Sequence, residues 1–281
     1  MIKFSNYPDY APEALNARVE KLCSQGFRNL NENEALRLIL SCIDLTTLEG
    51  SDTHEKVRKL CEQAGSFRRK NPALPDTAAV CVYPPFVATA KKALEGSGIK
   101  VAAVAGAFPS GQSPIHVKTT EVEWTAAQGA DEIDMVISRG TFLEGQYDIV
   151  AEEVAAIKKA CGTAHLKVIL ETGELVTSAN IRKASELSIL AGGDFIKTST
   201  GKIQPAATES ASLIMLETIR EYYEMTGIRI GFKPAGGIAE PEQALRYLML
   251  VDQILGEEWL KPELLRFGAS RLAGKIADRI S

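Results

Sequence analysis

The sequence predicts a (β/α)8 TIM barrel preceded by an N-terminal helical extension. Eight short apolar runs rich in β-branched residues recur along its 281 residues, and helical patterns separate them. Most of these runs are apolar throughout, as expected for strands of a parallel sheet that is buried on both faces. No GxGxxG motif follows the first run, which favours a closed barrel over an open doubly wound sheet.

The predicted strands recur at a spacing of roughly 20–40 residues, which leaves room for one helix after each strand. They cover residues 39–45, 78–83, 100–108, 132–138, 166–171, 194–199, 228–234 and 264–270. The predicted helices show apolar residues at i, i+3, i+4 and i+7, a proline in the first turn or a glycine at the end. The clearest of them cover residues 54–64, 148–162, 178–193 and 240–250.

The chain divides into two parts without a glycine-serine linker between them. Residues 1–38 precede the first strand and contain two helical patterns, 12–25 and 31–40. We expect residues 1–38 to form a helical extension that packs on the barrel, and residues 39–281 to form the catalytic barrel.

Composition and charge exclude several classes of protein. The net charge of −4 and the pI of about 5.6 leave no broad basic field for nucleic acid. No run of 18 apolar residues is present, and an N-terminus with Asp9 and Glu13 does not resemble a signal peptide. The five cysteines are odd in number and show no CxxC spacing, which argues against disulfides or a zinc site. We therefore expect a cytoplasmic protein that binds neither membrane nor nucleic acid.

Charged residues gather where the predicted strands end. Asp44, Asp134, Lys167, Lys197 and Lys233 all lie at or near the carboxyl ends of strands, where barrel enzymes carry their active sites. Barrel interiors are usually filled by Val, Ile and Leu, and lysine is rarely buried without a partner. One such lysine could be an ion-paired structural residue, but three facing two aspartates favour a catalytic site.

Buried lysines are suited to imine chemistry. A neutral amine attacks a carbonyl and loses water to give an imine, which accepts electrons when a C–C bond breaks or forms. Burial and a neighbouring cation lower the pKa of the amine, and Lys167 or Lys233 would supply that cation beside Lys197. Asp134 is placed to move protons.

A metal site is not expected. Three lysines would repel a cation from the two aspartates. The three histidines show no ligand spacing and are interpreted as surface or helix-end residues.

Glycine-rich loops follow three adjacent strands and point to a phosphate. They are "TGK" after the sixth strand, "AGG" at 235–237 and "GAS" at 268–270. Barrels often bind phosphate on the loops after strands 7 and 8, where glycine lets the backbone approach the anion. Lys202 would add a positive charge. Each loop could also be no more than a tight βα turn.

Six motifs together resemble deoxyribose-phosphate aldolase, a family of class I aldolases. They are "CIDLTTL", "VCVYP", "GADEIDMV", "LKVILETGEL", "DFIKTSTGK" and "GFKPAGG". The likeness runs through all eight βα units, from about residue 40 to 272. It implies reversible cleavage of 2-deoxy-D-ribose 5-phosphate to D-glyceraldehyde 3-phosphate and acetaldehyde. It also implies a homodimer that needs no cofactor.

The resemblance assigns a role to each candidate residue. Lys197 matches the lysine that forms the Schiff base, Lys233 the lysine that perturbs it and transfers protons, and Asp134 the acid/base partner, which works through an ordered water. Asp44 and Lys167 match supporting residues, and Cys81 matches a cysteine near the substrate entrance. The phosphate cradle corresponds to Gly201, Lys202, Gly236, Gly237, Gly268 and Ser270.

Four features depart from the family pattern. Ala239 stands where many bacterial members have arginine, and Arg271 stands where a second serine is common. The segment before the first strand is longer than in compact members, and the chain ends without the terminal tyrosine of some members. These differences bear on rate and substrate tolerance. Two alternatives to the assigned activity are another Schiff-base enzyme, such as a transaldolase-like barrel, and a non-catalytic sugar-phosphate-binding barrel.

Overall fold

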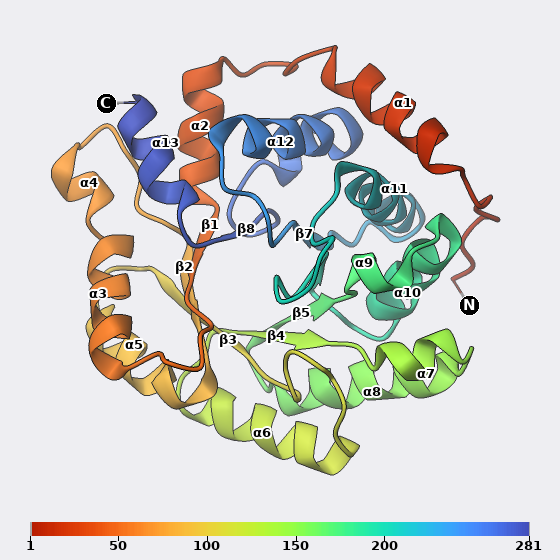
Figure 1. Cartoon of the computed structure of the whole chain (residues 1–281), viewed down its shortest axis with the longest axis horizontal. Helices are drawn as coiled ribbons and strands as arrows, with labels where there is room; N and C mark the ends of the chain where they lie inside the picture. Colours follow the sequence, from red (N-terminus) through yellow and green to blue (C-terminus); the bar gives the residue numbers. More distant parts are fainter. Residues whose placement is uncertain (1, 281) are drawn as a thin grey trace.

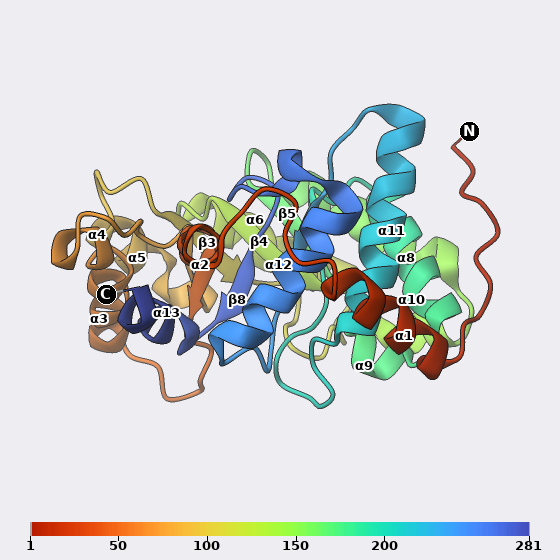
Figure 2. The ribbon, with the colours of Figure 1, turned by 90° about the horizontal axis from the view of Figure 1, so that it is seen from above.

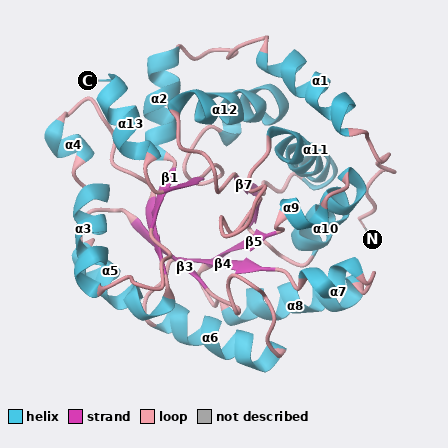
Figure 3. Cartoon of the chain, in the orientation of Figure 1, coloured by secondary structure: helices cyan, strands magenta, loops and turns pink. Residues whose placement is uncertain are grey.

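The computed structural model describes residues 2–280 and shows eight parallel strands surrounded by helices (Figure 1, Figure 3). The strands follow the order β7-β6-β5-β4-β3-β2-β1-β8. Bridges from Phe232 to Leu265 and from Ala235 to Gly268 join the two ends of this sheet, so the barrel is closed. The strands are β1 Ile43–Thr46, β2 Ala79–Val82, β3 Lys100–Val104, β4 Glu132–Val136, β5 His165–Ile169, β6 Phe195–Lys197, β7 Gly231–Lys233 and β8 Phe267–Ala269.

Helices lie between successive strands and cover the outside of the barrel (Figure 1). The α-helices are α1 Pro12–Cys23, α2 Glu32–Ser41, α3 His54–Ala64, α4 Phe67–Lys70, α5 Val87–Ala93, α6 Ile115–Ala127, α7 Arg139–Leu143, α8 Tyr147–Ala160, α9 Thr172–Leu175, α10 Ser178–Leu190, α11 Glu209–Thr226, α12 Pro241–Leu255 and α13 Leu272–Ile280. Two 3-10 helices, η1 Pro84–Phe86 and η2 Glu257–Trp259, complete the described elements. The (β/α)8 fold predicted from the sequence is confirmed.

The first strand is shorter than predicted. Residues 39–41 of the expected strand 39–45 continue α2, and β1 begins only at Ile43. Asn31 and Glu34 form a capping box at the start of this helix, with hydrogen bonds of 2.9 and 3.0 Å between side chain and backbone. The apolar run is therefore the buried face of a helix followed directly by a strand. Residues 228–230 likewise precede β7 rather than forming part of it.

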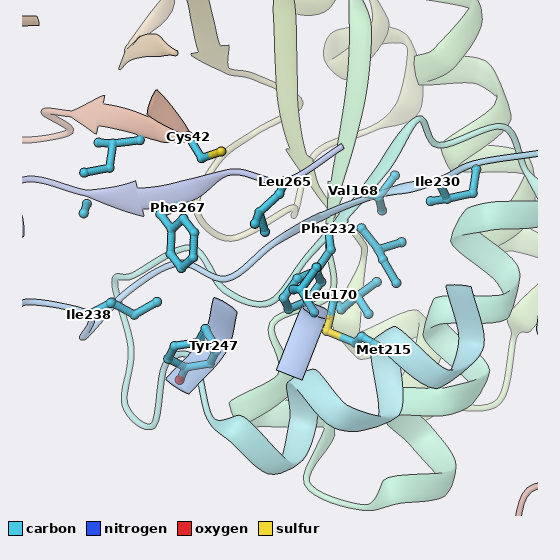
Figure 4. Close-up of a cluster of buried hydrophobic side chains, with 14 of the residues drawn as sticks. Cys42, Val168, Leu170, Met215, Ile230, Phe232, Ile238, Tyr247, Leu265 and Phe267 are labelled. Atoms are coloured by element: carbon cyan, nitrogen blue, oxygen red, sulfur yellow. The ribbon is translucent and has the colours of Figure 1, made fainter. Parts of the chain in front are cut away.

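Each strand presents one face to the helices and the other to the barrel interior. Figure 4 shows Val168, Phe232, Leu265 and Phe267 in a buried apolar cluster that also contains Met215 of α11. Residues one position away face inward because side chains alternate along a strand. Several of these inward positions carry the charged residues described below.

The N-terminal helices lie on the outer surface of the barrel. Helix α1 contacts α11 and α12, and α2 contacts α12 and α13. Figures 1 and 2 both show α1 beside α11. Arg18 of α1 forms an ion pair with Glu217 of α11, and Arg246 of α12 pairs with Glu20. Among the described helices, none combines the length and hydropathy needed to cross a membrane.

Candidate active site

Five strands bring the predicted lysines and aspartates together inside the barrel. Lys197 and Lys233 end β6 and β7, whereas Asp134 and Lys167 lie in the middle of β4 and β5. Asp44, Asp134, Lys167 and Lys233 are completely buried, and Lys197 is 3% exposed. Parallel register explains part of this arrangement, since Asp134 is level with Lys167 and Lys197 is level with Lys233. The five side chains therefore form one buried cluster, as the sequence predicted.

Asp134 is the centre of this cluster. Its Oδ2 accepts hydrogen bonds from Lys197 Nζ at 2.8 Å and from Lys233 Nζ at 2.7 Å. Its Oδ1 accepts a hydrogen bond from Lys167 Nζ at 3.0 Å. Lys233 Nζ also lies 2.5 Å from Asp44 Oδ2. One carboxylate thus contacts all three lysines.

Two members of the network, Glu132 and Arg266, were missed by sequence reasoning. The guanidinium of Arg266 donates to Asp44 Oδ1 at 2.7 Å and makes two bonds to Glu132, at 3.0 and 2.6 Å. Glu132 also accepts a hydrogen bond from Lys167. Strand periodicity carried a signal for both, because Glu132 precedes Asp134 by two residues and Arg266 precedes Gly268 by two.

The lysines differ in their electrostatics. Burial, together with the nearby charge of Lys233, lowers the pKa of Lys197 despite the opposing effect of Asp134. Burial alone would also lower the pKa of Lys233 and Lys167, but adjacent carboxylates outweigh it and raise both pKa values. Lys197 is therefore the lysine of the cluster that gives up its proton most readily.

The two aspartates are held in the ionised form. Burial alone would raise the pKa of Asp134, but the charges of three lysines reverse that effect and hold its pKa well below the ordinary value. For Asp44 the charges of Lys233 and Arg266 likewise outweigh burial and lower the pKa. Both side chains are hydrogen-bond acceptors at neutral pH.

A cavity of about 610 Å³ opens above the cluster at the carboxyl ends of the strands. Of the five clustered residues, Lys197 alone lines it. All six residues of the expected phosphate cradle line it too: Gly201, Lys202, Gly236, Gly237, Gly268 and Ser270. The amine of Lys197 can therefore meet a small molecule that the glycine loops also contact.

The glycine loops touch one another closely. A Cβ atom on Gly236, which has φ +84°, would lie 2.7 Å from Ala206 Cβ and 3.0 Å from Gly201 Cα. A Cβ atom on Gly268 would lie 2.7 Å from Ala235 Cβ. Real Cβ atoms do not approach this closely, so glycine is required for the loops after β6, β7 and β8 to meet.

The cations around the cavity have different partners. Lys202 Nζ donates to the carbonyl of Leu48 and lies 3.1 Å from Glu49 Oε1. The sequence predicted that Lys202 faces a phosphate; in the structure, its ammonium group lines the cavity and also binds the loop after β1. Lys56 and Lys59 also line the cavity and pair with Asp52 and Glu55. Arg271 lines the cavity as well, and within residues 2–280 it forms no ion pair.

Glu171 is a further residue that the sequence analysis did not assign to the site. It is fully buried and adopts a left-handed backbone with φ 57°. Its carboxylate accepts hydrogen bonds from the Thr200 backbone N–H at 3.1 Å and the Thr200 hydroxyl at 2.5 Å, and Arg139 pairs with it at 3.1 Å. Glu171 therefore anchors the loop that follows β6.

Cys81 does not lie at an entrance. It is 1% exposed and packs against Ala102 and Val104 inside the barrel. Burial raises the pKa of its thiol to about 11. All five cysteines are free and buried. Within residues 2–280, no group of three or more His, Cys, Asp or Glu side chains is arranged to hold a metal ion.

A parallel barrel that brings lysines and carboxylates together beneath a polar cavity has the architecture of a barrel aldolase. Residues 38–257 match the family model described as DeoC/LacD family aldolase, and the chain belongs to this family. It is an enzyme of the lyase class.

Individual relatives agree with this assignment. The chain is 46% identical over 253 residues to deoxyribose-phosphate aldolase of Homo sapiens, which covers 85% of this chain and 78% of the human protein. It is 44% identical over 256 residues to the Bos taurus protein of the same name, covering 86% and 79% of the two chains.

Solved structures show the same fold. A structure from Coccidioides immitis has a TM-score of 0.73 at 28% identity, covering 96% of this chain and 98% of its own. A tetrameric deoxyribose phosphate aldolase from Aeropyrum pernix has a TM-score of 0.68 at 23% identity, covering 96% and 97%.

Proposed function

We propose that the enzyme cleaves 2-deoxy-D-ribose 5-phosphate reversibly to D-glyceraldehyde 3-phosphate and acetaldehyde through a Schiff base on Lys197. The names of the human and bovine relatives support the substrate. The observation that carries the mechanism is the position of Lys197: its amine has a lowered pKa, shares a carboxylate with Lys233 and lines the cavity.

The reaction begins with attack of the neutral Lys197 amine on C1 of the open-chain sugar. Loss of water gives an iminium ion. The C3 hydroxyl loses its proton, the C2–C3 bond breaks and its electron pair moves to the iminium, which becomes an enamine. D-Glyceraldehyde 3-phosphate leaves, the enamine takes a proton at C2, and water releases acetaldehyde and the free lysine.

Asp134 and Lys233 move the protons of this sequence. The ionised carboxylate of Asp134 is a proton acceptor within reach of Lys197, and Lys233 is the protonated partner on the same oxygen. Asp44 and Lys167 support them: Asp44 holds Lys233, and Lys167 holds the other oxygen of Asp134. Cys81 takes no part in proton transfer, because its buried thiol stays neutral.

The substrate phosphate binds at the loops after β6, β7 and β8. Backbone N–H groups of Gly201, Gly236 and Gly237 supply donors, and Ser270 adds a hydroxyl. Lys202 and Arg271 supply positive charge at the wall of the cavity.

Borohydride reduction in the presence of 2-deoxy-D-ribose 5-phosphate tests the nucleophile. We expect one stable adduct on the peptide that contains Lys197, detected by mass spectrometry, and no adduct in Lys197→Met. Lys100→Met is the matched control, because Lys100 is exposed at the opposite end of the barrel, at the start of β3. Equal trapping in Lys197→Met would disprove the assignment.

A donor screen separates this reaction from that of a transaldolase-like enzyme. Acetaldehyde and D-glyceraldehyde 3-phosphate should yield 2-deoxy-D-ribose 5-phosphate, whereas ketose phosphates should not serve as donors. Activity with ketose donors and none with acetaldehyde would favour the alternative.

We further propose a cytoplasmic homodimer. Five free, buried thiols suit a reducing compartment. The dimer is an expectation from the family resemblance, and light scattering after size exclusion tests it: the mass should be twice that of the 30.4 kDa chain.

A further inference from the structure

Six buried charged side chains form a closed ring in which cations and anions alternate. Each member is at most 5% exposed. Every neighbouring pair is joined by an ion pair of 3.0 Å or less. In order around the ring, the members are Arg266, Asp44, Lys233, Asp134, Lys167 and Glu132, and Glu132 contacts Arg266 again.

The charges of this ring cancel. Three carboxylates face three cations, so the fully ionised ring is neutral. Lys197 stands outside it and is attached only through Asp134 Oδ2, which already accepts a hydrogen bond from Lys233. A proton on Lys197 would add a seventh, uncompensated charge to a largely buried site, which is costly.

We propose that this ring, closed by Arg266 and Glu132, determines which lysine is the free amine. Every carboxylate of the buried cluster is paired within the ring, so Lys197 has no counter-charge of its own. The proposal deepens the proposed function, because it rests on Lys197 being the nucleophile. Arg266 and Glu132 are thus positioning residues that act on Lys197 through the other ring members.

Arg266 is suited to close the ring because its guanidinium does not lose its proton in proteins. Its Nε donates to the carbonyl of Pro262 at 2.5 Å, and its two other nitrogens bind Asp44 and Glu132. A lysine in this position could itself lose a proton, whereas the arginine keeps the charge count of the ring constant.

The charged and titratable groups that face Lys197 come from several elements. Asp134 comes from β4, Lys233 from β7 and Cys81, whose thiol stays neutral, from β2. Lys167 of β5 acts through Asp134, and Lys202 lines the same cavity. Among them only Asp134 is an anion bonded to Lys197, so the ring's hold on Asp134 decides the charge of the amine.

Two substitutions change the net charge of the ring in opposite directions. Arg266→Met leaves two cations facing three carboxylates, so Lys197 should retain its proton as the third cation. Glu132→Gln leaves three cations facing two carboxylates, so Lys197 should lose its proton more readily. The titration of Lys197 should move up by about one pH unit in the first variant and down by about one in the second.

Competitive labelling with acetic anhydride between pH 5 and 10 measures this titration on the peptide containing Lys197. The pH profile of kcat/KM for 2-deoxy-D-ribose 5-phosphate should show its acidic limb moving the same way. Shifts in the same direction for both variants, or no shift in either, would overturn the proposal. General structural damage does not produce shifts of opposite sign.

Two further variants test whether the charge balance of the ring is the cause of the shifts. The double variant Arg266→Met/Glu132→Gln restores a balanced count of two and two, and its titration should return close to that of the wild type. Arg266→Lys keeps a cation that can lose its proton, so it should move the titration less than Arg266→Met does. If circular dichroism shows that Arg266→Met does not fold, the expected downward shift of the Lys197 titration in Glu132→Gln still tests the proposal.

Failure of this proposal is distinguishable from failure of the proposed function. Labelling reports the Lys197 amine whether or not it reacts with substrate. An absent borohydride adduct in the wild type would reject Lys197 as the nucleophile. An adduct in the wild type combined with unchanged Lys197 titrations in the variants would reject only the proposed role of the ring.

Discussion

Lys197 and Lys233 donate hydrogen bonds to the same atom, Oδ2 of Asp134, at 2.8 and 2.7 Å. Two amines on one oxygen cannot both be protonated without strong mutual repulsion. Asp134 and Asp44 together outweigh burial and raise the pKa of Lys233, whereas burial and the charge of Lys233 lower the pKa of Lys197. Under the proposed mechanism, Lys233 is accordingly the proton donor and Lys197 the nucleophile.

Replacement of Asp134 by Asn should remove the carboxylate that transfers protons in the proposed reaction. The amide has nearly the same shape but no charge and cannot accept a proton from either lysine. We expect kcat to fall by roughly 10²- to 10⁴-fold, the usual size of a lost acid/base group. Steady-state kinetics with 2-deoxy-D-ribose 5-phosphate measures the change, and a kcat within threefold of wild type would contradict the role of Asp134.

The lowered pKa of Lys197 has a defined effect on the pH profile. The amine is reactive only when it is unprotonated, so activity is present above its pKa and is lost as the pH falls through it. Because burial lowers this pKa, the acidic limb should lie below the ordinary lysine value of about 10.4. The rate of borohydride trapping as a function of pH measures it, and a limb at or above that ordinary value would contradict the electrostatic interpretation.

The sequence predicted the lysines and aspartates of the cluster because of one simple rule. Parallel strands end on the same side of the barrel, so polar residues at several strand ends must meet. This rule did not identify Glu132 and Arg266, because both lie deeper in the barrel, below Asp134 and Gly268. Their pairing across the barrel depends on how all eight strands close, which no single segment of sequence specifies.

Lys202 illustrates a second limit of local patterns. Its place after a glycine at a strand end predicted a charge facing a phosphate, but no local pattern indicated its partners within the protein. The fold brings the loop after β1 beside it, and Leu48 and Glu49 become its partners. Glu171, which has a positive φ, likewise has its buried contacts with Thr200 and Arg139, which are distant in sequence.

Gly236 and Gly237 form a matched pair for testing the close approach of the loops. Both have a positive φ, +84° and +80°, so alanine strains the backbone similarly at either position. At Gly236 the new methyl would also meet Ala206 and Gly201, whereas at Gly237 it meets nothing within 4 Å. Gly236→Ala should therefore lower the melting temperature clearly more than Gly237→Ala in thermal unfolding. Equal losses would show that the contact is unimportant.

Thr200→Val should weaken the anchor of the loop after β6. The substitution keeps the shape of the side chain but removes the hydroxyl that donates to Glu171 and accepts from the Lys202 N–H. Loss of a hydrogen bond to a buried charge should reduce the free energy of unfolding by about 1.5–3 kcal/mol. Urea unfolding measures this, and Thr200→Ser, which keeps the hydroxyl, is the control. A stability equal to wild type in Thr200→Val would exclude the anchoring role.

Arg271 should contribute to phosphate binding, because it lines the cavity and, within residues 2–280, forms no ion pair that would occupy its charge. One charge-assisted hydrogen bond is worth about 1.5–3 kcal/mol, so Arg271→Ala should raise KM for 2-deoxy-D-ribose 5-phosphate roughly 10- to 100-fold. The value of kcat should change little, since the amine of Lys197 is untouched. Unphosphorylated 2-deoxy-D-ribose is the matched control substrate, and its kcat/KM should be the same in both enzymes. Arg271→Lys should recover part of the loss because it keeps the charge without the two-pronged geometry of the guanidinium. An equal loss with both substrates would mean that Arg271 supports the structure of the cavity rather than the phosphate.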